Sequence, residues 1–376
     1  METEYISLQS GAAGHAAIRR AAQALADGAL VVFPTETVYG VGAAATRQES
    51  VERLREVKGR SWKQPFTVHI GRREDSEQFV GGEGLTPVAR RFIRKGWPGP
   101  LTLVFPVTDP SAAPVFASLS ESGRTAIYAD NSVGLRYPDH PQGAAVLAEA
   151  GAPIIASSAN LGGRPAPTDV DGVRAELDGK VDIVIDGGPC RYKQASTIVS
   201  LNGTGYKVLR TGVYDERTVR RFATLTLLFV CTGNTCRSPM AEGLCRKLLA
   251  ERLGCEVGHL GRHGVQVLSA GTMSFPGARV SAEAVEVCRQ RGAEIADHVA
   301  RHLSVDLIHP ADYIFVMGRH HLEVIRSLSP AAAARAELLD PSGDIADPVG
   351  GTLQDYDAAA ERIEKALRTR LQEIPV

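Results

Sequence analysis

The sequence predicts an α/β protein of two domains. Its 376 residues exceed the roughly 100 to 200 residues of one ordinary domain. In both halves, apolar runs of strand length alternate with segments whose apolar residues recur at helical spacing. This alternation is regular throughout the second half, which favours a doubly wound parallel sheet there. The first half is compatible with an α/β or an α+β sheet.

The expected elements follow in order along the chain. The first half has strand-like runs at 28–35, 65–70, 101–107, 153–160, 181–188 and 196–201, and helical patterns at 16–26 and 48–58. The second half has strand-like runs at 225–231, 265–271 and 311–317, and helical patterns at 239–253, 282–292, 331–334 and 356–371. The domains are expected at 1–215 and 225–376. The linker between them, 216–224, is charged and helix-like, unlike a flexible Gly/Ser linker.

Composition excludes several classes of protein. With 44% hydrophobic and 23% charged residues, the chain is neither disordered nor fibrous. Lys plus Arg (42) nearly balance Asp plus Glu (43), so direct binding to duplex nucleic acid is not expected. No apolar run approaches about 18 residues. The acidic, polar start METEYISLQSG is unlike a signal peptide, so a cytoplasmic location without membrane contact is expected.

The cysteines and histidines suggest no metal site. Six cysteines are too sparse for a disulfide framework and match no paired CxxC zinc pattern. Five histidines of the second half lack a ligand-like spacing and are expected to be surface or structural residues: His263, His298, His302, His320 and His321.

The most specific motif is VCTGNTCRSPMAE at 230–242. An apolar strand ends at Cys231, and a helix begins near Pro239 after a short loop. Backbone N–H groups of such a loop, together with the helix dipole, bind an anion and are expected to lower the pKa of the Cys231 thiol. Arg237 offers a bidentate fork for phosphoryl oxygens, and Ser238 can donate to the thiolate. The supporting loop residues are Thr232, Gly233, Asn234, Thr235, Cys236 and Ser238, of which Asn234 tolerates a left-handed backbone.

From about 225 to 371 this pattern resembles the low-molecular-weight protein tyrosine phosphatase family, whose loop is Cys-x5-Arg-Ser. The resemblance implies that Cys231 attacks phosphorus, that Arg237 holds the resulting phosphocysteine, and that no cofactor is needed. It also implies an aspartate general acid followed by proline. Asp347 fits that role better than Asp340, because Gly350, Gly351 and Tyr356 follow it as in the family.

The substrate of this domain is expected to be a phosphoprotein. Eukaryotic members usually carry aromatic residues just after the Asp-Pro, whereas Val349 and Gly350 follow here. In its loop the sequence resembles the bacterial branch that hydrolyses phosphoarginine, because that branch carries threonine at the position of Thr235, where other members carry a bulkier aliphatic residue. The alternatives are a phosphotyrosine phosphatase and an arsenate reductase. A thioredoxin-coupled arsenate reductase needs two further cysteines, and this sequence has no cysteine partner near Cys288. Cys231 and Cys236 are close enough in sequence for a reversible disulfide, which is a hypothesis.

Four segments of the first half gather cationic and small polar residues at strand ends, where α/β proteins bind ligands: 33–42, 57–70, 133–141 and 155–168. Lys58 and Arg60 are spaced to hold a polyphosphate, and Ser158 and Asn160 add hydroxyl and amide donors. This set favours a nucleotide. Taken singly, Lys58 is equally compatible with a solvated helix end.

Over residues 10–213 the set resembles the YrdC-like threonylcarbamoyl-AMP synthase family, which implies a twisted mixed sheet. The resemblance implies synthesis of L-threonylcarbamoyladenylate from L-threonine, bicarbonate and ATP, with Mg²⁺ on the pyrophosphate. A separate transferase would then modify tRNA. The implied ATP-binding residues are Lys58, Arg60, Ser132, Ser158, Asn160 and Arg210; those for threonine are Thr35, His69, Arg136 and Ser196. The alternatives are a non-catalytic RNA- or nucleotide-binding module and carbamoyl transfer from carbamoyl phosphate.

Overall fold

The computed structural model describes residues 2–7, 12–81, 84–203 and 205–375. The chain divides into two compact units, residues 1–222 and 223–376, and each is described by itself. The segment expected between the domains forms helix α8 (Glu216–Ala223). Its Phe222 packs edge-on against Tyr214 and Phe92 of the first unit, with ring centroids 5.1 and 6.4 Å apart. This aromatic cluster fixes the helix on the first unit.

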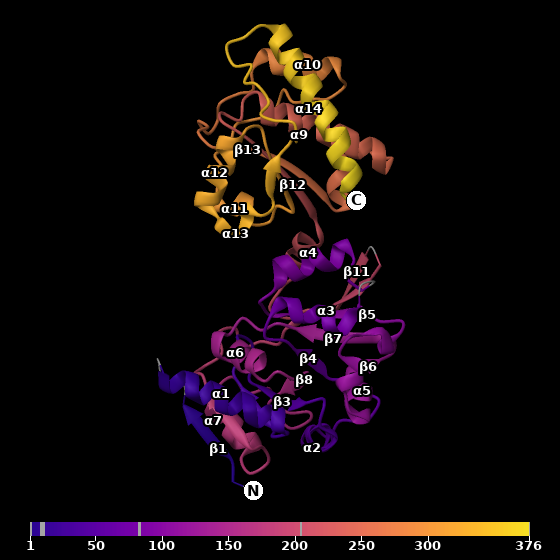
Figure 1. Cartoon of the computed structure of the whole chain (residues 1–376), viewed down its shortest axis with the longest axis vertical. Helices are drawn as coiled ribbons and strands as arrows, with labels where there is room; N and C mark the ends of the chain where they lie inside the picture. The colour runs from indigo at the N-terminus through magenta and orange to yellow at the C-terminus, as the bar shows by residue number, and fades with distance from the viewer. Residues whose placement is uncertain (1, 8–11, 82–83, 204, 376) are drawn as a thin grey trace. The chain divides into compact units, whose positions relative to one another are not determined.

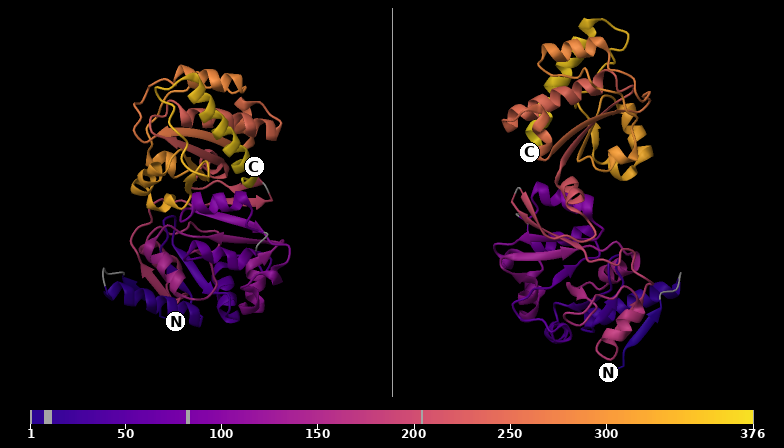
Figure 2. Two further views of the ribbon diagram at one scale, coloured as in Figure 1. Left: turned by 45° about the horizontal axis from the view of Figure 1, so that its top comes forward. Right: turned by 180° about the vertical axis from the view of Figure 1, so that it is seen from behind.

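The first unit contains a mixed sheet, as predicted. Among the described residues its path runs β1 (Glu4–Ser7), β9 (Ile183–Asp186), β2 (Val31–Phe33), β3 (Gly40–Ala44), β8 (Ile154–Ser158), β4 (Thr67–His69), β7 (Ser132–Arg136), β5 (Leu101–Pro106), β10 (Thr197–Asn202) and β11 (Gly205–Arg210). Strand β6 (Tyr128–Ala129) pairs with β7. β1 and β11 lie at opposite edges (Figure 1; Figure 2).

Strand β3 was not among the strands predicted from the sequence, which singled out 33–42 only as a segment with small polar residues near a strand end. Its glycines weaken the usual strand pattern, but they have a packing role. A Cβ added at Gly42 would lie 2.9 Å from the ring of Phe33. Close packing of β3 on β2 therefore requires glycine.

Helices cover this sheet: α1 (Ala12–Asp27), α2 (Gln48–Lys58), α3 (Glu77–Val80), α4 (Pro87–Gly96), α5 (Glu121–Ile127), α6 (Pro141–Glu149) and α7 (Val170–Leu177). The core between α1, α6 and the sheet contains Leu25, Phe33, Val146 and Ile154. Among the described residues, no helix of either unit combines the length and the apolar character needed to cross a membrane.

The second unit confirms the predicted doubly wound parallel sheet. Its strand order is β13 (Val265–Gly271), β12 (Leu225–Cys231), β14 (Tyr313–Val316) and β15 (Ala336–Leu338), all parallel. Figure 1 shows helices α9 (Arg237–Leu253), α10 (Ala282–Gln290) and α14 (Leu353–Glu373) on one side of the sheet. The other side carries α11 (Val305–Ile308), α12 (Arg319–Leu328) and α13 (Pro330–Ala333).

Alternation along β12 explains these two layers. Leu227 and Phe229 belong to the core under α9, α10 and α14, whereas Leu228 and Val230 belong to the core under α12 and α13. Successive side chains of a strand point to opposite faces, so an uninterrupted apolar run fits a strand covered on both sides. The chain leaves β12 at the point where strand order reverses, which is where such sheets bind ligands.

Candidate active sites

The first unit holds a cavity of about 470 Å³ over one face of the sheet, a volume typical of small-molecule sites. Eight of the ten residues expected to bind ATP or threonine line it: Thr35, Arg60, His69, Arg136, Ser158, Asn160, Ser196 and Arg210. His69 and Ser158 come from antiparallel neighbours, β4 and β8. Each residue is at the carboxyl end of its strand, and the carboxyl ends of antiparallel strands point in opposite directions. The site therefore extends across the face of the sheet and is not confined to one set of strand ends.

Lys58 and Ser132 do not line the cavity. Lys58 lies directly behind it, where Nζ donates to the carbonyl of Ser158 at 2.6 Å, to the carbonyl of Asn160 and to Asn160 Oδ1 at 3.2 Å. Ser132 begins β7 and donates to the carbonyl of Ala129 at 2.9 Å. It is four residues from Arg136, or about 13 Å along a strand.

Burial changes the chemistry of Lys58. The residue ends α2 and is only 7% exposed. Burial, aided by the neighbouring charge of Arg60, lowers the pKa of Lys58 to about 8. The ammonium is therefore mainly protonated at neutral pH and titrates just above it, while it holds the turn from Ser158 to Asn160 in place.

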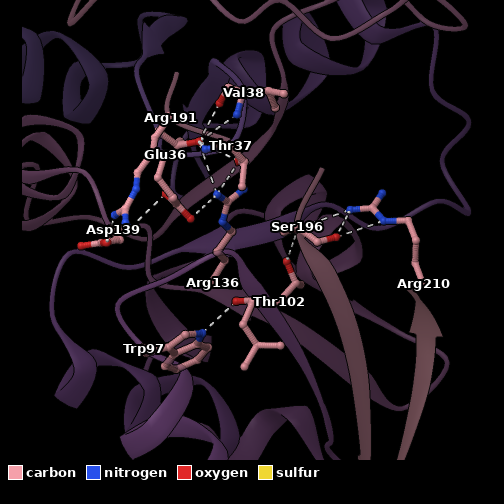
Figure 3. A network of polar contacts seen from close by, with 12 residues as sticks. Glu36, Thr37, Val38, Trp97, Thr102, Arg136, Asp139, Arg191, Ser196 and Arg210 are labelled. Atoms are coloured by element: carbon pink, nitrogen blue, oxygen red, sulfur yellow. Dashed lines mark hydrogen bonds and ion pairs between the residues drawn. The ribbon is translucent and has the colours of Figure 1, made fainter. Parts of the chain in front are cut away.

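A buried ion pair fixes Arg136, which lines the cavity (Figure 3). Nη2 lies 2.9 Å from Glu36 Oε1 and donates to Thr37 Oγ1 at 2.6 Å and to Thr35 Oγ1 at 3.3 Å. Nε of Arg136 is buried without a hydrogen-bond partner among the described residues. The sequence analysis did not single out Glu36. The feature that could have indicated it is a carboxylate within a segment of otherwise apolar and hydroxyl-bearing residues.

A second cluster joins β5, β10 and β11 (Figure 3). Arg210 donates from Nη2 to the carbonyl of Ser196 at 2.8 Å and to its hydroxyl at 3.3 Å. Ser196 Oγ lies 3.0 Å from Thr102 Oγ1. Thr102 is a further cavity residue that the sequence did not single out.

His69 also lines the cavity, as a neutral ring. Burial, followed by the charge of Arg136, lowers the pKa of His69 to about 3. Its edge packs against the ring of Phe33 at 5.9 Å. His69 can therefore donate or accept a hydrogen bond near neutral pH but carries no charge.

Positively charged side chains line the cavity, and two of them have ion-pair partners, Glu36 and Glu176. The sequence missed Arg164, which lines it and also contacts Glu176 Oε1 at 3.2 Å. Four arginines line the cavity: Arg60, Arg136, Arg164 and Arg210. Among the described residues, no carboxylate lines it. The arrangement fits a multiply charged anion.

In the second unit, Cys231 ends β12 and helix α9 begins at Arg237. Asn234 adopts φ 55°, the left-handed conformation expected for it. Its backbone N–H donates to Cys231 Sγ at 3.2 Å, and Ser238 Oγ lies 2.9 Å from the same sulfur. The loop therefore places one N–H donor and one hydroxyl group on the thiol.

The pKa of Cys231 differs from the expectation. Burial raises the pKa of this thiol, which is only 2% exposed, although Ser238, the backbone N–H of Asn234 and the charge of Arg237 all act to lower it. The sequence suggested the lowering groups but not the burial, which comes from packing under α9 and α14. Formation of the thiolate therefore depends on those donors.

Asn234 is held by a polar network that local sequence did not indicate. Its Nδ2 donates to Ser238 Oγ at 2.9 Å and to Ser269 Oγ at 2.8 Å. Its Oδ1 accepts from the backbone N–H of Arg301 at 2.9 Å, and His298 Nε2 lies 3.2 Å from its carbonyl. His298 is thus structural, one of the two roles expected for it.

Arg237 faces the expected general acid. Its Nη2 contacts Asp347 Oδ2, and its Nη1 donates to the carbonyl of Ile345 at 2.9 Å. Nε of Arg237 is buried without a partner among the described residues, which leaves a donor for an anion. Asp340, the competing aspartate, is instead paired with Arg362 at 2.5 Å.

The cysteines of this unit are free thiols. Cys236 Sγ lies 3.3 Å from the hydroxyl of Tyr356. Cys288 is fully buried in the core, and burial raises its pKa to about 12. Cys288 is therefore poorly placed to shuttle a disulfide, as an arsenate reductase would require.

Two exposed apolar side chains flank the loop. Met273 and Phe275 are 73% and 83% exposed. Their segment is tied to the loop because the N–H groups of Thr272 and Met273 donate to the carbonyls of Cys231 and Thr232, both at 2.9 Å. They provide an apolar surface beside the site that the sequence did not single out. Val349, after Asp347, is also exposed.

The two units thus define two classes of domain: a mixed-sheet domain with an arginine-lined cavity, and a doubly wound domain with a cysteine in an anion-binding loop. A family model described as telomere recombination (Sua5, YciO, YrdC) matches residues 23–212. One described as low molecular weight phosphotyrosine protein phosphatase matches residues 226–375. The chain belongs to the Sua5/YciO/YrdC family through its first domain and to the low-molecular-weight phosphatase family through its second.

Individual relatives match one part of the chain or the other. Threonylcarbamoyl-AMP synthase of Bacillus subtilis is 38% identical over 197 residues, which are 52% of this chain and 53% of that protein. The solved structure of P. abyssi Sua5 with L-threonine is 24% identical, covers 72% of this chain and 92% of that one, and has a TM-score of 0.50, a likeness of fold. A YwlE mutant from Bacillus subtilis is 32% identical, covering 40% of this chain and 98% of that one, with a TM-score of 0.35.

The chain spans about half the length of the first curated relatives it matches, 53% for the Bacillus subtilis synthase and 54% for that of Pyrococcus abyssi. Among the described residues, no group of three or more His, Cys, Asp or Glu side chains is placed to hold a metal ion.

Proposed function

We propose that the first domain synthesises L-threonylcarbamoyladenylate from L-threonine, bicarbonate and ATP, with release of pyrophosphate. The observation that carries this is the arginine-lined cavity, in which eight of the ten expected binding residues meet. Relatives named threonylcarbamoyl-AMP synthase support the same activity. A separate transferase would move the threonylcarbamoyl group to tRNA.

The residues suggest how the substrates lie. The unpaired Nε of Arg136 is a donor for the carboxylate of threonine, and Thr35 and Ser196 offer hydroxyls beside it. Arg60, Arg210 and the turn held by Lys58 would bind ATP. The chemistry needs no covalent nucleophile, since the threonine carbamate attacks the α-phosphorus and pyrophosphate leaves, so catalysis is by positioning and charge neutralisation.

Mg²⁺ would neutralise the pyrophosphate as it leaves. The described residues that line the cavity include no carboxylate. The ion would therefore be held chiefly by the phosphate oxygens of ATP, as is common for Mg²⁺.

ATP affinity is expected to weaken as pH rises through about 8, because deprotonation of Lys58 removes a positive charge behind the phosphate site. An exposed lysine would keep its charge to higher pH. The dissociation constant for ATP alone, measured between about pH 7 and about pH 9, should rise by up to about tenfold. The Lys58→Arg variant keeps its charge and should lack this rise; the same rise in both proteins would assign the effect to another group.

We further propose that the second domain is a cysteine-dependent phosphatase of phosphoproteins. Cys231 Sγ attacks phosphorus while Asp347 gives its proton to the leaving atom, and the bond from phosphorus to that atom breaks. Water then attacks the phosphocysteine, Asp347 takes a proton from the water, and the S–P bond breaks to release inorganic phosphate. Arg237 holds the phosphoryl oxygens in both steps. The contact between Arg237 and Asp347 supports this assignment.

Phosphoarginine is the substrate that we propose for this site. Thr235 carries a hydroxyl in the loop where bulkier aliphatic residues are usual in the family, and a guanidino group supplies N–H donors for it. Val349 and Gly350 offer no aromatic ring to stack on phosphotyrosine. A phosphotyrosine phosphatase is the second candidate, favoured by the exposed Phe275 beside the loop.

The Thr235→Ile variant should lose preference for phosphoarginine. Replacing the hydroxyl by an ethyl group leaves an N–H of the substrate unpaired, which typically costs about tenfold in rate. The measurement compares kcat/KM for one peptide carrying either phosphoarginine or phosphotyrosine. Thr235→Ser, which keeps the hydroxyl, should retain the wild-type ratio. A ratio that is the same in wild type and in Thr235→Ile would remove Thr235 from substrate selection.

A further inference from the structure

His321 occupies a position that neither proposed activity uses. It lies in the first turn of α12, is 0% exposed, and places Nε2 3.1 Å from Thr232 Oγ1. Thr232 directly follows the nucleophile Cys231. Helix α12 follows β14, so His321 approaches the loop from the strand beside β12.

The hydrogen bonds around Thr232 are directional. Arg237 Nη2 lies 3.5 Å from Thr232 Oγ1 and can only donate to it. The hydroxyl proton of Thr232 is then available for a second partner, and His321 Nε2 is the neighbour that can accept it. In this arrangement the proton of the imidazole is on Nδ1.

His321 is suited to accept because its ring is neutral. Burial, the neighbouring His320 and the charge of Arg237 lower the pKa of His321 to about 4, against smaller opposing effects of the Gly318 carbonyl and Asp344. Neutral imidazole has one donor and one acceptor nitrogen. Nδ1 is buried and makes no regular hydrogen bond with the described residues. A buried polar atom of this kind costs stability, so packing alone does not explain a histidine at this place.

We propose that His321 is a positioning residue of the phosphate loop: it accepts the hydroxyl proton of Thr232 and thereby turns the lone pairs of that hydroxyl toward Arg237. The guanidinium is then held for phosphoryl oxygens. This inference rests on the proposed phosphatase function. It makes the pair of Thr232 and His321 a support of Arg237 that does not touch the substrate.

The test uses His321→Leu and His321→Gln in the full chain. His321→Leu removes the acceptor and introduces an apolar side chain of similar size. The value of kcat/KM for p-nitrophenyl phosphate and the affinity for inorganic phosphate should each fall by about tenfold. The Tm should be unchanged or raised. His321→Gln can still offer an acceptor and should stay within about threefold of wild type. His320→Gln removes the exposed neighbouring imidazole and should leave all three quantities unchanged.

A double-mutant cycle with Thr232→Val separates positioning from packing. If His321 acts through the hydroxyl of Thr232, the double variant should be no worse than the more damaged single variant. Additive losses, or a fall in Tm with phosphate affinity unchanged, would overturn the inference.

Phosphate affinity, measured by calorimetry, needs no turnover. If the wild-type chain binds phosphate without hydrolysing phosphoesters, the proposed function fails while the cycle still decides the role of His321. If the wild-type chain does not bind phosphate, the inference fails together with that function.

Discussion

Cys231→Ser is expected to lose turnover of phosphoesters by roughly 10⁴-fold or more, the scale on which removal of a catalytic nucleophile acts. The serine oxygen is a far weaker nucleophile than the thiolate that Ser238 and the Asn234 N–H support. The measurement is kcat/KM for p-nitrophenyl phosphate and for a phosphoarginine peptide. Pyrophosphate release by the first domain should be unchanged in the same variant.

Cys255→Ser is the matched control, because Cys255 belongs to the same domain and lies outside the loop. It should retain full phosphatase activity. Substantial turnover by Cys231→Ser would mean that hydrolysis does not pass through a phosphocysteine. Equal loss in both variants would point to damage of the fold.

Lys58→Ala is expected to lower kcat/KM for ATP-dependent pyrophosphate release by about 10² to 10³-fold, comparable to the loss of a preorganised donor at other sites. The variant removes a positive charge behind the cavity and releases the carbonyls of Ser158 and Asn160 that Nζ holds. The quantity to measure is pyrophosphate formed in the presence of L-threonine, bicarbonate and ATP.

Lys63→Ala is the control for this experiment. Lys63 is exposed, follows Lys58 closely in the sequence and does not line the cavity. Its replacement should leave the rate within about twofold, as is usual for surface substitutions. Similar losses in the two variants would show that general charge near the cavity, and not Lys58 itself, supports ATP.

Local sequence predicted the conformation of the loop 231–238, because the residues that define it lie close together in the chain. A strand that ends at Cys231 and a helix that starts at Arg237 leave few conformations for the loop between them, and the left-handed Asn234 follows from that geometry. The predicted lowering of the Cys231 pKa was wrong in direction. The burial that raises this pKa depends on packing by α14, which is more than a hundred residues away in the sequence.

The cavity of the first domain was predicted less completely, because its contacts are long-range. Lys58 reaches carbonyls about 100 residues along the chain, and Glu36 pairs with Arg136 at a similar separation. A single sequence identifies the residue types but not these partners. Arg164 lay within a segment that the sequence singled out, yet only the fold places it in the cavity. Ser132 as an ATP ligand stays a prediction.

The alternation of strands and helices predicted the α/β class of both units and six strands of the first sheet, but it missed the central strands β3 and β7 as well as the edge strands β1 and β11. β1 and β11 were missed because each lies at an edge of the sheet and has one neighbour there, so it lacks the apolar pattern of a strand covered on both sides.

The central proposal is that the first domain is a synthase and not only a nucleotide-binding module. The direct measurement is pyrophosphate release by the wild-type chain with ATP, L-threonine and bicarbonate, and with each of the three omitted in turn. We expect release only when all three are present, at a rate unaffected by Cys231→Ser. Binding of ATP without pyrophosphate release in the complete mixture, while the phosphatase is active, would contradict the proposed synthase and leave the first domain a binding module.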